Sequence, residues 1–168
     1  MTTFRIEKLS RYHAVDTFDC GEPALDRFLA RFAWGSQQAN ASQTYVALAD
    51  DVVVGFFTLV VGQVAYEDAH ERLAKGLARH PIPLLLIARL AIHRAWQGQG
   101  LGAGLLKDAM RRTVHAADIA GIRALAVHAK DETAAAFYRR FDFIPSPTDP
   151  LHLFLLIKDL ACYVTASN

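Results

Sequence analysis

The chain has 168 residues, of which 52% are hydrophobic and 21% charged, and its formal net charge at pH 7 is +1. This length and composition are typical of a single globular domain over residues 1–168 with a sizeable buried core, and they exclude disordered and fibrous proteins. No apolar run has the length of a transmembrane helix and no signal-peptide core follows Met1, so we expect a cytoplasmic protein without a membrane partner.

Cysteine usage adds a further exclusion. Cys20 and Cys162 lie far apart, and neither belongs to a Cys-x-x-Cys pair or has a histidine at metal-ligand spacing. We therefore interpret both as reduced structural residues, and no metal site is expected.

A strand and an amphipathic helix are predicted first. Residues 4–9 alternate apolar and polar side chains, which is typical of a strand. Pro23 suits the first turn of a helix, and the apolar residues that follow it would share one face. These residues are Leu25, Phe28, Leu29 and Phe32. Residues 35–42 carry no apolar period, so we interpret them as a mobile loop or a frayed helix end.

A β-hairpin is predicted next. Two β-rich runs, residues 44–49 and 52–61, flank the two-residue acidic turn Asp50-Asp51. Residues 66–78 are mixed in character and predict a short helix with a surface loop. The segment His80-Pro81-Ile82-Pro83 ends that loop before the next strand.

The stretch from Leu84 to Leu106 is the most informative part of the sequence. A continuous apolar run, interrupted only by Arg89, predicts a strand buried on both faces. The glycine-rich residues 97–104 follow, and helical spacing then continues to about residue 120, with Gly121 as a C-cap. Glycines allow a turn to point several backbone N–H groups at one ligand, and the helix N-terminus adds further donors. The sequence therefore predicts a cradle for a phosphate or pyrophosphate, although a glycine run alone is also compatible with a turn that binds nothing.

The glycine spacing excludes the two common nucleotide motifs. A P-loop needs Lys and then Ser or Thr directly after its last glycine, whereas Gly104 is followed by Leu105-Leu106. A dinucleotide-binding turn needs Gly-x-Gly-x-x-Gly, whereas every second residue from Gly98 to Gly104 is glycine.

The remainder of the chain predicts a strand, a helix and a closing strand. Residues 122–129 form an apolar run, and strand, helix, strand at this spacing predicts a parallel crossover. Asp131 would cap a second helix from Glu132 to Arg140, and residues 151–157 would close the sheet. The predicted order, β α β β α β α β, corresponds to a mixed α/β sandwich.

The pattern Gln97-x-x-Gly100-x-Gly102 after a buried strand resembles the acyl-CoA pyrophosphate loop of the GNAT family of N-acetyltransferases. The resemblance covers about residues 18–159 and implies the GNAT fold, a mixed six- to seven-stranded sheet flanked by helices, with acetyl-CoA as cosubstrate. It implies that the backbone of Leu90, Ala91 and Ile92 holds the pantetheine arm. The residues that it assigns to the pyrophosphate are Gln97, Gly98, Gln99, Gly100, Leu101 and Gly102.

The same resemblance points to Tyr138 as a catalytic residue. In GNAT enzymes a tyrosine in the corresponding helix often lies close to the thioester sulfur, which implies a general acid that protonates the departing CoA thiolate. The alternative is a tyrosine that only packs against Phe137 and Phe141. No side chain stands out as a general base, and His93 and His128 are interpreted as structural.

Several short segments are similar to one narrower branch, the acetyltransferase toxins of bacterial toxin–antitoxin pairs, which acetylate the amino acid carried by charged tRNA. They include residues 18–21, 45–47, 89–91, 96–100, 128–131, 143–147, 151–153 and 158–160. This resemblance implies aminoacyl-tRNA as substrate, a ribbon–helix–helix antitoxin as partner, and a homodimer in the bacterial cytoplasm. Asp142 departs from the glycine usual in the family, and we expect modest local strain there because Asp tolerates a left-handed turn.

An RNA substrate requires cations near the acceptor end, and arginines pair well with phosphates. The candidates are Arg27, Arg31, Arg89, Arg94, Arg139 and Arg140. Two other functions stay open at this point. One is acetylation of a protein N-terminus or a small amine, and the other is a non-catalytic CoA-binding regulatory module.

Overall fold

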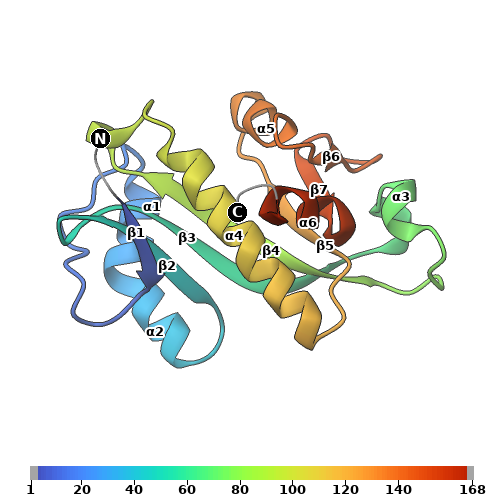
Figure 1. Cartoon of the computed structure of the whole chain (residues 1–168), viewed down its shortest axis with the longest axis horizontal. Helices are drawn as coiled ribbons and strands as arrows, with labels where there is room; N and C mark the ends of the chain where they lie inside the picture. Colours follow the sequence, from blue (N-terminus) through green and yellow to red (C-terminus); the bar gives the residue numbers. More distant parts are fainter. Residues whose placement is uncertain (1–3, 166–168) are drawn as a thin grey trace. The chain divides into compact units, whose positions relative to one another are not determined.

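The computed structural model describes residues 4–165, whose elements are shown in Figure 1. Within these residues seven strands form one sheet in the order β1-β2-β3-β4-β5-β7-β6. The strands are β1 (Arg5–Lys8), β2 (Gln43–Ala49), β3 (Val52–Val64), β4 (Ile82–Ile92), β5 (Ala124–His128), β6 (Ile144–Pro145) and β7 (His152–Leu156). The helical elements are α1 (Pro23–Arg27), the π-helix η1 (Phe28–Phe32), α2 (Ala33–Gln38), the 3-10 turn η2 (Tyr66–Asp68), α3 (Glu71–Ala74), the 3-10 turn η3 (Arg94–Trp96), α4 (Leu101–Ile119), α5 (Glu132–Arg139) and α6 (Ile157–Thr165).

The chain divides into two compact units. The first runs up to Val60 and also takes in Ala88–Ala109, and the second comprises Val61–Ile87 and the chain from Met110 onward. The pairing is mixed, because β4 and β5 are parallel whereas β1, β2 and β3 are antiparallel neighbours. The predicted mixed α/β sheet of six to seven strands is therefore confirmed, and it has seven strands within residues 4–165. No helix within residues 4–165 combines the length and apolar character that crossing a membrane would require.

The hairpin of the first unit forms as predicted. Asp50 and Asp51 have φ angles of 48° and 67°, the left-handed conformation that a two-residue hairpin turn needs at both positions. Beneath β2 and β3 lies a core that includes Leu29, Val46 and Phe56. This core fixes one face of the sheet under α1, η1 and α2.

The helix predicted after Pro23 is interrupted by a π-helical turn. The backbone N–H of Ala33 donates to the carbonyl of Phe28, five residues earlier, so the turn holds one residue more than an α-helical turn. Leu29 is 1% exposed, as predicted, but Phe32 is 57% exposed and Ala33, at 0%, occupies the buried position. The assignment of Phe32 to the core face was wrong, because the extra residue rotates it away from the core.

The segment after this turn also differs from the prediction. Residues 35–38 belong to the regular helix α2, where a loop or a frayed end was predicted. Gln37 explains the order, because its buried side-chain amide donates to the carbonyl of Leu9 at 2.7 Å and accepts from the N–H of Thr44 at 3.0 Å. A buried polar group with both partners satisfied fixes the end of the helix.

In the second unit, β5 pairs in parallel with β4 from Leu84↔Ala124 to Ile87↔Val127, which confirms the predicted crossover. The chain from α5 to α6 forms one group of elements, coloured orange to red in Figure 1. The short strand β6 and the helix α6 were not predicted, and the predicted last strand ends one residue early, where Ile157 begins α6. Gly121, predicted as the C-cap, follows the end of α4 at Ile119, but it is not among the glycines with positive φ and so does not form the left-handed cap that glycine often provides.

Candidate active site

The glycine-rich loop joins β4 to α4. Gly98 and Gly100 have φ angles of 79° and 82°, a conformation that side chains rarely adopt, so the predicted need for glycine is confirmed at these two positions. A Cβ at either glycine would meet no heavy atom of the described residues within 4 Å. Backbone conformation is therefore the reason for these glycines, and the space above them is open to a ligand. α4 then begins at Leu101, so its unpaired first N–H groups adjoin the loop.

Hydrogen bonds connect the segment Asp19-Cys20-Gly21 to the residues that lead into the loop. The backbone N–H of Arg94 donates to the Asp19 carbonyl at 2.8 Å, and its guanidinium donates to the Asp19 carboxylate at 2.7 Å. The hydrogen bond from Arg94 and a second from the N–H of Gly21 hold the pKa of Asp19 below its usual value. The segment that resembled the toxin branch thus connects directly to the start of the loop.

Gln97 completes this connection. Its side-chain Nε2 donates to the carbonyl of Cys20 at 3.0 Å and to the carbonyl of Ile92 at 2.9 Å. The amide nitrogen is therefore used within the chain, between the end of β4 and the Asp19-Cys20-Gly21 segment. Gln99 differs, because its Nε2 has only a long contact of 3.5 Å to the Ala95 carbonyl.

Cys20 is a structural residue in this arrangement. Its N–H donates to the Asp26 carboxylate at 2.9 Å, and its thiol donates to the Glu22 carbonyl at 3.6 Å. Burial, with a smaller contribution from Asp26, raises the pKa of the Cys20 thiol to about 12. The thiol is therefore neutral at pH 7 and is a poor nucleophile. Neither cysteine is in a disulfide within the described residues, and Cys162, in contrast to Cys20, is exposed.

The strand segment assigned to the pantetheine arm is backed closely by β3. A Cβ on Gly55 would lie 3.0 Å from Leu105 Cδ1, 3.2 Å from Ile92 Cδ1 and 3.3 Å from the carbonyl oxygen of Ala91. Only glycine allows this approach without displacing the backbone at Ala91. Ala91 itself is buried, whereas Leu90 and Ile92 are half-buried.

Tyr138 lies in α5, whose start is capped as predicted by Asp131, which accepts the N–H of Ala134 at 2.8 Å. The side chain is 6% exposed and packs edge-on against Phe137 and Phe143, with ring centroids 5.1 and 5.4 Å away. Burial raises the pKa of Tyr138 to about 12, so the phenol is protonated at pH 7. The Tyr138 hydroxyl makes no hydrogen bond within residues 4–165. Its oxygen is not fully enclosed by the described residues either.

The six candidate arginines separate by their partners. Arg94 is paired with Asp19 and Arg139 with Glu132. Arg140 lies 5.6 Å from the ring centroid of Phe137. Arg27 and Arg31 are exposed and form no ion pair with any residue between 4 and 165.

Arg89 is different from the other five. Its guanidinium carbon lies 3.6 Å from the ring centroid of Phe28, and no carboxylate within the described range pairs with it. Partial burial lowers the pKa of Arg89 below its ordinary value, although arginine remains charged at pH 7. A half-buried cation without a counter-charge, one residue before Leu90, is suited to binding an anion or a ring.

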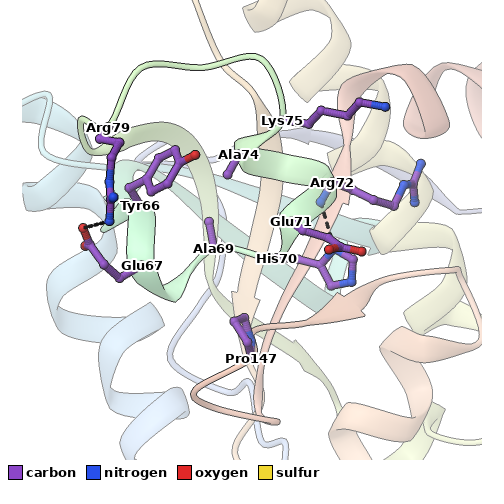
Figure 2. Close-up of a pocket in the computed structure, with 10 residues that line it drawn as sticks. All are labelled: Tyr66, Glu67, Ala69, His70, Glu71, Arg72, Ala74, Lys75, Arg79 and Pro147. Atoms are coloured by element: carbon purple, nitrogen blue, oxygen red, sulfur yellow. Dashed lines mark hydrogen bonds and ion pairs between the residues drawn. The ribbon is translucent and has the colours of Figure 1, made fainter.

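A hollow of about 850 Å³ lies in the second unit, and Figure 2 shows its lining. Most of its residues come from η2, α3 and the loop that follows, and Pro147 completes it from the loop after β6. Arg79 is 3.8 Å from Glu67 and Arg72 is 2.8 Å from Asp159, so these cations are compensated within the chain. Sequence reasoning predicted a short helix and loop here, and it assigned no ligand site.

Two further contacts were not predicted. Asp142 has a φ of 69°, in agreement with the expected left-handed turn, and its carboxylate accepts the hydroxyl of Tyr163 at 2.6 Å. His128 and His152 stack with ring centroids 3.8 Å apart, and burial, with a smaller effect of His128, lowers the pKa of His152 to about 4. Both contacts link residues far apart in sequence, so no local pattern indicates them. The described chain also contains no group of three His, Cys, Asp or Glu side chains that could hold a metal ion.

Comparison with known proteins places these features in a family. Residues 40–145 match the model of the acetyltransferase (GNAT) domain. The chain is 46% identical over 152 residues to a tRNA-acetylating toxin of Mycobacterium tuberculosis (strain ATCC 25618 / H37Rv), which covers 90% of this chain and 91% of that protein.

Solved structures agree with this match. AtaT complexed with acetyl-methionyl-tRNAfMet superposes with a TM-score of 0.88 at 29% identity, over 95% of this chain and 98% of that one. A tyrosine-to-phenylalanine mutant of AtaT, bound to acetyl-CoA and to the C-terminus of the antitoxin AtaR, gives 0.81 at 30% identity, over 97% and 99%. Because the domain match covers more than half of the residues and the relatives span nearly the whole chain, this protein belongs to the GNAT family of acetyltransferases.

Proposed function

We propose that this chain is a toxin that transfers the acetyl group of acetyl-CoA to the α-amine of the amino acid on aminoacyl-tRNA, and so blocks translation. The observation that carries the proposal is the similarity, over nine-tenths of the chain, to a relative named for acetylating tRNA. The AtaT structures support both substrates, because one contains acetyl-methionyl-tRNAfMet and another contains acetyl-CoA.

Acetyl-CoA would bind along β4 and the glycine-rich loop. The backbone of residues 90–92 would hold the pantetheine arm, and residues 97–102, from the loop and the first turn of α4, would hold the pyrophosphate through N–H groups. The left-handed conformations of Gly98 and Gly100, the open space above them and the adjoining start of α4 fit an anion of this size. Gln97 would contribute to this site through its hydrogen bonds to the carbonyls of Cys20 and Ile92, which hold the loop in place.

Tyr138 would act as the general acid. The amine nitrogen attacks the thioester carbonyl, the C–S bond breaks, the CoA sulfur takes a proton and the new amide nitrogen loses one. Burial raises the pKa of Tyr138, so the phenol is protonated at pH 7 and holds the proton that it would pass to the sulfur. It would recover a proton from the ammonium that the attack creates. Backbone N–H groups near residues 90–92 would stabilise the tetrahedral oxyanion.

The proposal is tested by incubating the protein with acetyl-CoA that carries a labelled acetyl group and a total pool of aminoacylated tRNA. Hydrolysis and mass spectrometry of the released amino acids should show labelled N-acetyl amino acids. If they are absent while acetyl-CoA still binds, the acceptor is a protein N-terminus or a small amine, and the proposed substrate is wrong. If no acceptor is acetylated, a CoA-binding regulatory module remains.

Tyr138→Phe tests the role of the phenol within the same assay. Because the hydroxyl has no hydrogen-bond partner in the described chain, the variant should fold and bind acetyl-CoA as the wild type does. Its kcat should fall by about 100-fold or more, which is the usual contribution of general acid catalysis. Tyr66→Phe, a change at a half-buried tyrosine of the hollow in Figure 2, serves as the control. A wild-type kcat for Tyr138→Phe would exclude the assignment.

The tRNA would bind through arginines that have no counter-charge of their own. Within residues 4–165, Arg27, Arg31, Arg89 and Arg140 meet this condition, whereas a phosphate at Arg94 or Arg139 must compete with a carboxylate. Each of Arg27→Gln, Arg31→Gln and Arg89→Gln should weaken tRNA binding and reduce its salt dependence, by a slope of about 0.7–0.9 for each lost phosphate contact. Arg139→Gln is the paired control, and an unchanged slope in the first three variants would remove them from the RNA contact.

We further propose a ribbon–helix–helix antitoxin as protein partner, a homodimer, and action in the bacterial cytoplasm, where charged tRNA is found. The AtaT structure that contains the C-terminus of AtaR supports an antitoxin partner. Light scattering of the purified chain measures its mass in solution. Co-purification with the product of a short adjacent reading frame tests the antitoxin, and a monomer or the absence of a bound partner would contradict these assignments.

A further inference from the structure

The π-helical turn η1 turns a phenylalanine outward that the hydrophobic pattern places in the core. Leu29 and Ala33 are buried, and Phe32 between them in sequence is 57% exposed. A π-turn is rare and often occurs at functional sites, because the inserted residue redirects side chains without ending the helix. Local patterns that the structure overrides in this way are most common where function requires it.

Exposed arginines precede Phe32 in the sequence. Arg31 precedes it and is exposed, and neither Arg31 nor Arg27 forms an ion pair within residues 4–165. The carbonyl of Phe28 closes the same turn by accepting the N–H of Ala33, and the guanidinium of Arg89 lies 3.6 Å from the Phe28 ring centroid. η1, which carries Phe32, is therefore joined to β4 within one unit of the chain by the contact between Arg89 and Phe28, four residues before Phe32. We call Arg31, Phe32 and Arg89 the aromatic–arginine surface.

This surface has the composition that proteins use for unpaired nucleotides. Single-stranded RNA is bound by stacking bases on aromatic rings and guanidinium planes, while cations follow the phosphates. Arg89 directly precedes Leu90, the first residue of the segment proposed to hold the pantetheine arm. A nucleotide on this surface would therefore lie next to the acyl donor, which is where the end of a charged tRNA must be.

We propose that Phe32 stacks on a base of the unpaired 3′ end of the tRNA, with Arg31 and Arg89 holding that end by its phosphates or bases. The inference rests on the proposed function, because it takes aminoacyl-tRNA as the substrate. It goes further by assigning recognition to an aromatic side chain and to the single-stranded end. A duplex contact would need cations only.

Exposure alone does not support this role, since single apolar residues are common on protein surfaces. Tyr12 is 82% exposed and has an arginine, Arg11, 5.1 Å from its ring centroid. It lies in a loop, however, and no π-turn or strand segment of the site adjoins it in sequence. Tyr12→Ala is therefore a matched control, an exposed aromatic next to an arginine in the same unit.

The experiment measures the equilibrium binding of two probes, deacylated tRNA and the same tRNA without its unpaired 3′ nucleotides. Phe32→Ala and Phe32→Leu remove the aromatic face, and Phe32→Trp keeps it. The first two should bind intact tRNA about tenfold more weakly than the wild type does, and the third should bind normally. Removing the 3′ nucleotides should weaken the wild type by at least as much, and then Phe32→Ala should cost nothing more.

Salt titration distinguishes stacking from charge. Phe32→Ala should lower the affinity at every salt concentration without changing the slope, whereas Arg31→Gln should reduce the slope. Melting temperature and acetyl-CoA affinity of each variant verify the fold, and both should stay close to the wild-type values because more than half of Phe32 is exposed.

Three results would overturn the inference. The first is a wild-type affinity of Phe32→Ala for intact tRNA. The second is that Phe32→Ala lowers the affinity for truncated tRNA as much as it lowers the affinity for intact tRNA. The third is that Tyr12→Ala lowers the affinity for intact tRNA as much as Phe32→Ala does. A wild-type protein without affinity for either RNA would refute this inference together with the proposed substrate. If tRNA binds in a Phe32-dependent way but no acetylated amino acid is formed, the inference stands and the proposed reaction fails.

Discussion

Replacing Gln97 should separate the support of the cofactor loop from contact with the cofactor. Gln97 Nε2 donates to the carbonyls of Cys20 and Ile92 at 3.0 and 2.9 Å, and Gln97→Ala removes both hydrogen bonds. A neutral hydrogen bond contributes about 0.5–1.5 kcal/mol net, and water can reach these carbonyls when the side chain is gone. We therefore expect a loss of about 1–2 kcal/mol in the free energy of unfolding. For a chain of this size that corresponds to a melting temperature lower by roughly 2–8 °C.

The assay is urea unfolding of the protein without acetyl-CoA, followed by acetyl-CoA titration. The ligand-free measurement reports the loop support alone, since no cofactor contact exists in it. Acetyl-CoA affinity should also fall, because a looser loop must be ordered on binding. Gln97→Glu should cost more than Gln97→Ala, because its carboxylate places oxygen atoms against two carbonyl oxygens.

Gln99→Ala is the matched control, since Gln99 has a single contact of 3.5 Å and its removal should change stability by less than about 0.5 kcal/mol. The reasoning is refuted if Gln97→Ala unfolds at the wild-type urea concentration, or if Gln99→Ala loses as much. Wild-type stability combined with lost acetyl-CoA affinity would show that Gln97 acts on the ligand directly.

Two other contacts give predictions of their own. The pKa of His152 is about 4 in the folded chain and near 6.5 when the chain is unfolded. Between these two pH values the unfolded state binds more protons than the folded state does. The free energy of unfolding should therefore fall as the pH falls from 6.5 toward 4. His152→Gln should flatten this part of the stability profile in urea titrations at pH 7, 5.5 and 4.5, and a profile identical to the wild type would contradict the assignment. Asp142→Ala should lower the free energy of unfolding by about 1–2 kcal/mol, because it removes the hydrogen bond from Tyr163 and leaves a side chain on a left-handed backbone. Asp142→Gly removes the same hydrogen bond, but glycine adopts the left-handed conformation without strain, which should offset much of the loss. Equal losses in the two Asp142 variants would show that φ contributes nothing there.

Sequence reasoning succeeded where the determining interactions are local. The turn at Asp50-Asp51, the cap at Asp131 and the left-handed glycines Gly98 and Gly100 each depend on a few consecutive residues. The parallel crossover to β5 follows from the length of the connection. Such features are visible in one sequence, because the residue types have no good alternative conformation.

The failures concern contacts made across the chain. The regular turn of α2 depends on Gln37, whose partners are Thr44 in β2 and Leu9, directly after β1. The end of the closing strand is equally non-local, since the N–H of Ile157 donates to the carbonyl of Arg123 as α6 begins. The outward rotation of Phe32 had no signal in the helical period, because a π-turn is a change of that period itself.

The same distinction decides what an arginine can do in the site. The sequence does not distinguish the six candidate arginines from one another. The structure does, because some of them form an ion pair with a carboxylate and others do not. Arg94 meets Asp19, which is 75 residues away, and through this pair it belongs to the support of the loop. A substitution of Arg94 should therefore lower the affinity for acetyl-CoA. A substitution of Arg31, which has no acid partner within residues 4–165, should lower the affinity for RNA alone. Loss of tRNA acetylation in both variants would look alike in an activity assay, so the separate binding constants for the two substrates are what assign each arginine to its role.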